Sequence, residues 1–156
     1  MARFAWLIAV CFVLAMSPVM AQQSAVGTTM SVAAVHASAL AGEIVFVDVR
    51  TPDEWKESGV PSSAYAITMH QDPAAFVAAL QSAVGGDKTR RLAIICRSGN
   101  RTSAIYGDLQ KAGFTNLINV AEGVAGGPNG RGWLKAGLPV RAPNQSRAVA
   151  PVTAKP

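Results

Sequence analysis

Short, continuous apolar runs alternate along the chain with segments in which apolar residues recur at helical spacing. The runs at 44–48, 92–95 and 117–120 are typical of strands that are buried on both faces of a sheet. Helices are expected over 32–40, after 51, after 72 and over 102–112. Strands that alternate with helices predict an α/β fold, in which a mainly parallel central sheet carries helices on both faces.

Capping residues locate the ends of these helices. Ser31 is expected to cap the first helix, and Gly42 follows its end. Asp72-Pro73 starts the third helix, and Gly85-Gly86 ends it. The apolar stripes expected to face the core are Ala75, Phe76, Ala79 and Leu80 in the third helix and Ala104, Ile105, Leu109 and Ala112 in the fourth.

The segment Thr51-Pro52-Asp53-Glu54 has the pattern of a capping box with proline at the first helical position. This pattern explains Glu54 as a capping residue, so no catalytic role is assigned to it. Trp55 is expected to pack the helix onto the core. Residues 58–61 should then form a turn that leads to a short strand near 64–68.

The loop after the strand at 92–95 carries the candidate chemistry. Its residues are Cys96, Arg97, Ser98, Gly99, Asn100 and Arg101. Because the loop lies between a strand and the start of a helix, its backbone N–H groups and the helix dipole should point at the cysteine sulfur. These donors and the two arginines favour the nucleophilic thiolate. A buried structural cysteine is the alternative, which the surrounding glycine and arginines disfavour.

Three segments together resemble the rhodanese family of sulfurtransferases. They are Val47-Asp48-Val49-Arg50 with Thr51 to Trp55, the loop Cys96 to Arg101 with Thr102-Ser103-Ala104, and the ending from Gly132-Trp133 to Gly137-Leu138-Pro139-Val140. The likeness covers residues 31–140 and implies a single rhodanese-like domain. Many members have a Gly-His-Ile-Pro-like turn where this chain has Gly59-Val60-Pro61, so the histidine is missing and donor specificity stays open.

The resemblance implies a reaction for the loop. The Cys96 thiolate would attack the outer sulfur of a small anionic donor such as thiosulfate and become a persulfide. The N–H groups of residues 97–101 would hold the terminal sulfur, while Arg97 and Arg101 would attract the donor. No metal or organic cofactor is implied.

The acceptor and the supporting residues are less closely defined. Cys11 lies in an expected export signal, so the mature chain would keep one thiol, and the acceptor would be external: cyanide in an assay, a thiol or another protein in the cell. Arg50 is expected to pair with an acid or to help define the pocket. Asp48 should either orient an arginine near the loop or cap the strand end, and both roles stay open.

Two other function classes share parts of this pattern. Cysteine phosphatases and arsenate reductases place five residues between their cysteine and arginine, whereas four separate Cys96 from Arg101. The smaller loop favours one sulfur atom over a tetrahedral oxyanion. The second alternative is a rhodanese-like module that binds a sulfur species or a partner protein without turnover, and the intact nucleophile disfavours it.

The two ends of the chain differ from its middle. Residues 1–21 have a basic Arg3, an apolar core and a small-residue cleavage site ending at Ala21, which is typical of an export signal. We therefore expect a periplasmic or secreted protein with no membrane contact after cleavage. The expected divisions are the signal at 1–21, a linker at 22–30, the domain at 31–140 and a disordered Pro/Ala-rich tail at 141–156.

The charges give no support to nucleic-acid binding. The whole chain has a formal net charge of +5, but all nine acids and ten of the fourteen Lys and Arg lie at 22–140, which leaves that region at only +1. It contains no basic stripe with interleaved aromatic residues. His36 and His70 lack the spacing of metal ligands, so both are expected to be ordinary helix or loop residues.

Overall fold

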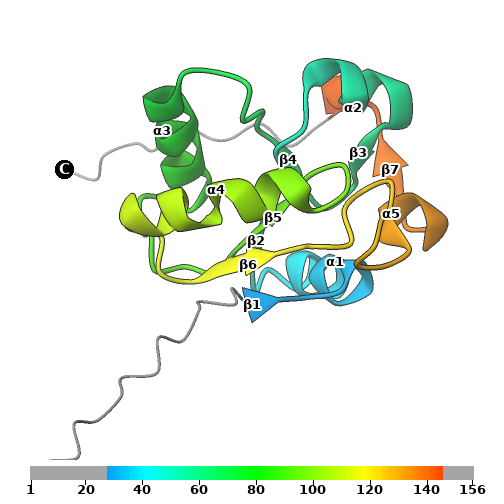
Figure 1. The fold of residues 1–156 in the computed structure, drawn as a ribbon, viewed down its shortest axis with the longest axis horizontal. Coiled ribbons are helices and arrows are strands. Elements are labelled where there is room, and N and C mark those ends of the chain that lie inside the picture. Colours follow the sequence, from blue (N-terminus) through cyan, green and yellow to red (C-terminus); the bar gives the residue numbers. More distant parts are fainter. Residues whose placement is uncertain (1–27, 146–156) are drawn as a thin grey trace, which may run out of the picture.

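The computed structural model describes residues 28–145 (Figure 1). Its central sheet has five strands in the order β1-β6-β5-β2-β4, and every pairing between neighbours is parallel. The strands are β1 (Thr28–Thr29), β2 (Val45–Asp48), β4 (Tyr65–Ala66), β5 (Leu92–Ile95) and β6 (Leu117–Asn119). This sheet confirms the predicted α/β class. The expected export signal and residues 146–156 of the expected tail lie outside the described residues.

Helices cover both faces of this sheet. They are α1 (Val32–Leu40), α2 (Pro52–Ser58), α3 (Pro73–Ala83), α4 (Asn100–Lys111), α5 (Gly132–Lys135) and a 3₁₀ turn, η1 (Pro143–Gln145). α1 and α5 pack on one face, and α3 and α4 pack on the other. None of the helices in residues 28–145 is long and apolar enough to cross a membrane.

Alternate residues of each central strand belong to two separate cores. Phe46, Ala93, Ile95 and Ile118 face α1 and α5, whereas Val45, Val47, Leu92 and Ile94 face α3 and α4. Both faces are apolar, which is why these strands read as continuous apolar runs. Cys96 lies two positions after Ile94, so its side chain joins the α3/α4 core.

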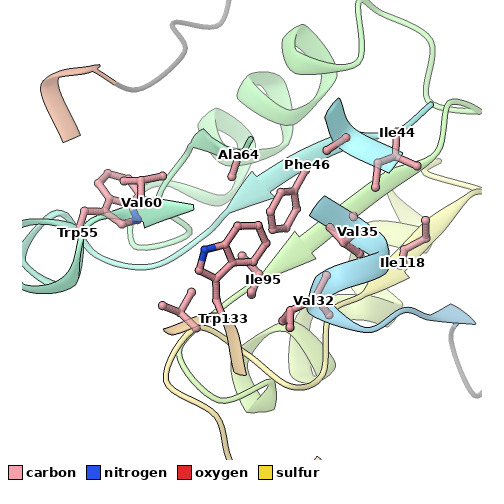
Figure 2. Packing of buried hydrophobic residues seen from close by; sticks show 14 residues of the cluster. Val32, Val35, Ile44, Phe46, Trp55, Val60, Ala64, Ile95, Ile118 and Trp133 are labelled. Atoms are coloured by element: carbon pink, nitrogen blue, oxygen red, sulfur yellow. The ribbon is translucent and has the colours of Figure 1, made fainter. Parts of the chain in front are cut away.

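The buried Trp133 of α5 closes the first core (Figure 2). Its ring lies 5.5 Å from that of Phe46, and its indole N–H donates to the carbonyl oxygen of Pro139 over 3.0 Å. His36 of α1 contacts the same ring edge-on at 5.1 Å. The chain ending that resembles the rhodanese family is thereby anchored to the sheet that positions the site.

The predicted caps of α1, α2 and α3 are confirmed, whereas α4 begins at Asn100, two residues before its expected start, so that Asn100 and Arg101 belong to the helix. Ser31 caps α1, Asp72 caps α3, and Thr51 with Glu54 forms the capping box of α2. Gly85 and Gly86 follow α3 with φ of 71° and 86°. Trp55 is buried, as expected.

Two positions of the predicted apolar stripes are wrong. Ala75 and Ala104 are exposed, while Phe76, Leu80 and Leu109 are buried as predicted. In α4 the buried position of the first turn is Thr102, a polar residue that an apolar pattern does not select. The inward face of α4 therefore consists of Thr102 together with Ile105, Leu109 and Ala112 of the expected stripe.

Short strands extend the domain beyond its expected limits. Val60–Pro61, predicted as part of a turn, forms β3 and pairs antiparallel with β7 (Val140–Arg141). Thr28–Thr29, assigned to the linker, adds β1 to the edge of the main sheet. Arg141, assigned to the tail, donates from Nη1 to the Ser62 carbonyl oxygen over 2.6 Å and from Nη2 to that of Ala64.

Candidate active site

The Cys96 sulfur lies at the N-terminal end of α4, where backbone N–H groups converge. The N–H of Gly99 donates to the Cys96 Sγ over 3.2 Å, and those of Ser98 and Thr102 also act on it. Burial works to raise the pKa of the Cys96 thiol, but these N–H groups and the Thr102 hydroxyl outweigh it and hold the pKa below its ordinary value. The loop therefore offers several donors to an anionic sulfur.

Gly99 gives the loop its shape. It is the N-cap of α4 and has a φ of 87°, in the left-handed region that favours glycine. A Cβ at this position would lie 2.1 Å from the carbonyl oxygen of Ala121, much closer than any non-bonded contact. Only glycine lets the loop approach that backbone while its N–H points at the sulfur.

The glycine-rich segment after β6 supports the loop from the side. The N–H groups of Val124 and Ala125 donate to the carbonyl oxygens of Cys96 and Arg97, each over 2.9 Å. A Cβ at Gly123 would lie 2.4 Å from the Arg97 carbonyl oxygen. The two backbones are thus held in contact, which limits the freedom of the Cys96 loop.

Arg101 connects the loop to two other elements. Its Nη2 lies 2.5 Å from Glu54 Oε1 of α2, and its Nη1 lies 3.1 Å from His70 Nε2. The hydrogen bond from Arg101 lowers the pKa of Glu54 to about 2, against the opposing effect of burial. The pKa of Arg101 is raised, chiefly by its hydrogen bond to Glu54 and to a smaller degree by the Cys96 thiolate.

Two predictions about these partners need correction. Glu54 does complete the capping box, but it also neutralises Arg101, so the cap was only part of its role. His70 was expected to be an ordinary loop residue, whereas its ring contacts the arginine that ends the active loop. Sequence spacing gave no sign of either contact, because both join segments far apart in the chain.

Arg97 and Asn100 are exposed, whereas Arg101 is partly buried. Arg97 lines a cavity of about 90 Å³ together with Glu54 and Glu57, and Cys96 is not among its lining residues. Among residues 28–145, no acid lies within ion-pair distance of the Arg97 side chain. Arg97 is therefore a loop cation without an ion pair, although Glu54 and Glu57 line the same cavity, whereas Arg101 is paired directly with Glu54.

Asp48 and Arg50 form a buried ion pair at the end of β2. Arg50 Nη2 lies 2.8 Å from Asp48 Oδ2, and both side chains are at most 3% exposed. The same guanidinium donates to the Ser58 hydroxyl over 2.8 Å and to the Gly59 carbonyl oxygen over 2.6 Å. Asp48 fills both of the roles left open for it, because its Oδ1 accepts the backbone N–H of Arg50 over 3.0 Å at the end of β2 while the same carboxylate orients the Arg50 side chain. Through Arg50 the pair holds α2, which carries Glu54, against the sheet.

A polar network lies beneath the loop, between α4 and β6. Thr102 Oγ1 lies 3.6 Å from Cys96 Sγ, 2.9 Å from the Gly99 carbonyl oxygen and 2.7 Å from Asn119 Oδ1. Asn119 Nδ2 donates to the Ser103 hydroxyl over 2.8 Å. Thr102 and Asn119 were not among the predicted site residues. The sequence contains one signal for Asn119, which is the single polar residue at the end of an apolar strand, on the sheet edge where Cys96 lies.

The Cys96 side chain is 0% exposed in this structure. Its reactive atom is enclosed by the loop, by Thr102 and by the α3/α4 core. A ligand can reach the sulfur only after groups over the loop move.

Comparisons with known proteins agree with this geometry. The sequence profile of the Rhodanese-like domain matches residues 31–127. Thiosulfate sulfurtransferase 16, chloroplastic, from Arabidopsis thaliana is 32% identical over 130 residues, which cover 79% of this chain and 100% of that protein. A sulfurtransferase from Allochromatium vinosum is 30% identical over 101 residues, which cover 65% of this chain and 81% of that protein.

A solved structure gives the same result. The human single-domain sulfurtransferase TSTD1 superimposes with a TM-score of 0.50 at 25% sequence identity, and the match covers 70% of this chain and 96% of the human protein. The parallel sheet, the Cys96 loop at its edge and these matches agree with the resemblance seen in the sequence, and the chain belongs to the rhodanese-like domain family.

Proposed function

We propose that this protein is a sulfurtransferase that carries sulfane sulfur as a persulfide on Cys96. The observation that supports this most directly is the Gly99 N–H, which donates to the Cys96 Sγ over 3.2 Å at the start of α4. Donors fixed in this way stabilise an anionic sulfur without reorganising during the reaction. Two relatives that are named sulfurtransferases support the same reaction class.

The proposed cycle has two displacements at sulfur. In the first, the Cys96 thiolate attacks the sulfane sulfur of thiosulfate, a new S–S bond forms, the S–S bond of the donor breaks, and sulfite leaves with the bonding electron pair. In the second, a nucleophilic acceptor attacks the terminal sulfur of the persulfide. The Cys96–sulfur bond then breaks, and the thiolate is regenerated.

The acceptor comes from outside the chain in this proposal. Cys96 is the one cysteine among residues 28–145, so no neighbouring thiol of the domain can take the sulfur. Cyanide serves as the acceptor in an assay, and a small thiol or a protein thiol serves in the cell. We also propose that the protein acts in the periplasm or outside the cell, on the strength of the signal-like residues 1–21.

Access to Cys96 is part of the proposed mechanism. Since the thiol is 0% exposed, the donor must displace a side chain over the loop before it reaches the sulfur. Arg101 is the candidate, because it interacts with the Cys96 thiolate and is held by side-chain contacts alone, to Glu54 and His70. An anionic donor competes with Glu54 for this guanidinium.

The burial of Cys96 also favours a second candidate function. A rhodanese-like module that binds a partner without turnover has no need of an exposed sulfur, and buried cysteines are generally unreactive. The two functions differ in one observable property, which is whether Cys96 takes up sulfur.

Intact-mass measurement of the reduced protein, before and after thiosulfate, tests the proposal. The wild type should gain the mass of one sulfur atom, and cyanide should remove it with release of thiocyanate. The matched control is Cys96→Ser, which should stay folded and gain nothing. A wild type that is folded, has a free thiol and gains no sulfur from thiosulfate or from a small organic persulfide would favour the binding module. Protein recovered from a periplasmic fraction should begin at Gln22 if the export signal is removed.

A further inference from the structure

Thr102 has one hydroxyl proton and more than one acceptor for it. Asn119 Oδ1, the Gly99 carbonyl oxygen and the Cys96 sulfur lie 2.7, 2.9 and 3.6 Å from its Oγ1. Thr102 is 0% exposed and Asn119 is 8% exposed, so water cannot easily replace a missing partner. The direction of this one proton therefore determines which of its neighbours are satisfied.

With a neutral thiol, the network forms one continuous chain of donors. The Cys96 S–H donates to Thr102 Oγ1, the Thr102 hydroxyl donates to Asn119 Oδ1, and Asn119 Nδ2 donates to the Ser103 hydroxyl. The Ser103 hydroxyl in turn donates to the Gly99 carbonyl oxygen over 2.8 Å. Every hydroxyl and amide group has a partner in this arrangement.

With an anionic sulfur, the chain can run in the opposite direction. The Thr102 hydroxyl then donates to the sulfur, which leaves Asn119 Oδ1 without a donor. A rotation of the Asn119 amide by about 180° exchanges its oxygen and nitrogen, so that Nδ2 donates to Thr102 Oγ1 and Oδ1 accepts from the Ser103 hydroxyl. The Gly99 carbonyl oxygen keeps the backbone N–H of Ser103 at 3.1 Å. This second arrangement is also fully satisfied.

We propose that Asn119 is a positioning residue whose amide turns with the charge on Cys96, so that the Thr102 hydroxyl accepts from the thiol but donates to the anionic sulfur. An amide suits this task because it has a donor and an acceptor at equivalent positions, whereas a carboxylate or an apolar side chain has not. The inference deepens the proposed function, since it assigns a means of stabilising both the thiolate and the persulfide of that reaction.

The charged groups around Cys96 do not take part in this exchange. Arg101 of α4 faces the sulfur and is paired with Glu54 of α2. Asp48 and Arg50, at the end of the neighbouring strand β2, are paired with each other. None of them contacts Asn119 through a hydrogen bond or an ion pair among the described residues, so substitution of Asn119 changes the hydrogen bonds at sulfur and leaves these pairs intact.

The first test follows the Asn119 side-chain amide by ¹H–¹⁵N NMR during a pH titration of the full protein. Its signals should shift with the same midpoint as the ultraviolet absorbance of the Cys96 thiolate. The absorbance of Cys96→Ser is subtracted at each pH, which removes the contributions of Cys11 and the tyrosines. In Thr102→Val the Asn119 shift should be lost, whereas the Gly99 backbone N–H should still titrate. Thr102→Ser should restore the Asn119 shift. The proposal is overturned if the Asn119 amide signals of the wild type do not shift at the pH at which the Cys96 thiolate forms.

The second test measures coupling between Asn119 and Thr102. Thr102→Val should raise the pKa of Cys96 by about one unit, because a hydrogen bond to a charged group is lost. Asn119→Leu should raise it by less, because the hydroxyl still reaches the sulfur but is no longer polarised by the amide. Asn119→Leu should have no further effect in the Thr102→Val background. An equal shift in both backgrounds would show that Asn119 acts through packing, and it would contradict the inference.

These readouts do not depend on sulfur transfer. If Asn119 follows the thiolate but thiosulfate adds no sulfur to Cys96, the positioning role stands and the proposed function fails. If Cys96 takes up sulfur while Asn119 remains insensitive to the thiolate, the function stands and the positioning role fails.

Discussion

Glu54 and Arg101 lie 47 residues apart in the sequence and form an ion pair of 2.5 Å between Oε1 and Nη2. The other oxygen of the same carboxylate accepts the N–H of Thr51 over 3.0 Å. One side chain therefore completes the N-terminal cap of α2 and holds the arginine that ends the candidate active loop. The stability of a local helix and the position of Arg101 are linked through Glu54.

This link predicts a pH-dependent loss of stability in Glu54→Gln. The folded pKa of Glu54 is lowered to about 2, so its contribution is fully present above the unfolded pKa of about 4.3 and is lost as the pH falls toward 2. At pH 7 the variant should lose about 1–3 kcal/mol in the free energy of unfolding, and the difference from wild type should shrink below pH 4. Urea unfolding at both pH values measures this.

The control for Glu54→Gln is Asp53→Asn in the same helix. Asp53 pairs with Lys56, but both side chains are more than two-thirds exposed, at 91% and 72%. Exposed pairs of this kind contribute little. An equal loss in both variants, or a Glu54→Gln effect that does not depend on pH, would contradict the predicted role of the Glu54–Arg101 pair.

Gly99→Ala should disrupt the loop, because the new Cβ would lie 2.1 Å from the Ala121 carbonyl oxygen at a φ of 87°. We expect destabilisation of at least about 2 kcal/mol and a raised pKa of the Cys96 thiol, since the Gly99 N–H moves away from the sulfur. Thermal unfolding and a thiolate titration measure the two effects.

Gly107→Ala is the matched control on the same helix. Apart from the adjacent residues and the backbone of α4 itself, no atom lies within 4 Å of a Cβ at Gly107, so alanine should be neutral or should stabilise α4 by up to about 1 kcal/mol. If Gly99→Ala behaved like Gly107→Ala, the loop would not depend on the glycine backbone conformation.

Arg97→Ala should weaken the binding of an anionic donor with little effect on folding. Arg97 is an exposed residue of the loop, with no acid of residues 28–145 paired to its side chain. On the proposed function, we expect the KM for thiosulfate to rise about threefold to tenfold at low salt and less at high salt, because exposed charges are screened. Lys111→Ala, at the far end of α4 and paired with Asp108, should leave the KM unchanged. An effect that does not depend on salt would count against charge attraction.

Trp133→Ala should be strongly destabilising. The indole is fully buried against Phe46 and donates to the Pro139 carbonyl oxygen, so alanine would leave a cavity and remove one of the two donors to that oxygen, the other being the Ser62 N–H. We expect a loss of about 3–5 kcal/mol in urea unfolding. Leu134→Ala changes the next residue, which is 40% exposed, and should cost much less. Similar losses in the two variants would show that Trp133 is not a core residue.

Local patterns in the sequence predicted most of the fold. Apolar runs predicted the central strands, and Ser31, Thr51 and Asp72 marked helix starts because an N-cap needs only neighbouring residues. The loop from Cys96 to Arg101 was found in the same way, since strand, loop and helix are contiguous. The predicted apolar stripe of α4 wrongly included Ala104, because the buried residue of that turn is Thr102, which faces the sulfur and Asn119.

The tertiary structure alone decided which distant groups meet at Cys96. The parallel sheet brings the ends of β2, β5 and β6 to one edge, and this places Asn119 beside Thr102 and α2 beside α4. Glu54, His70 and Asn119 thereby become part of the site, although each has an ordinary explanation in its own segment. The reason is physical: capping and strand formation depend on neighbours in the chain, whereas ion pairs and hydrogen bonds across elements depend on how the sheet packs.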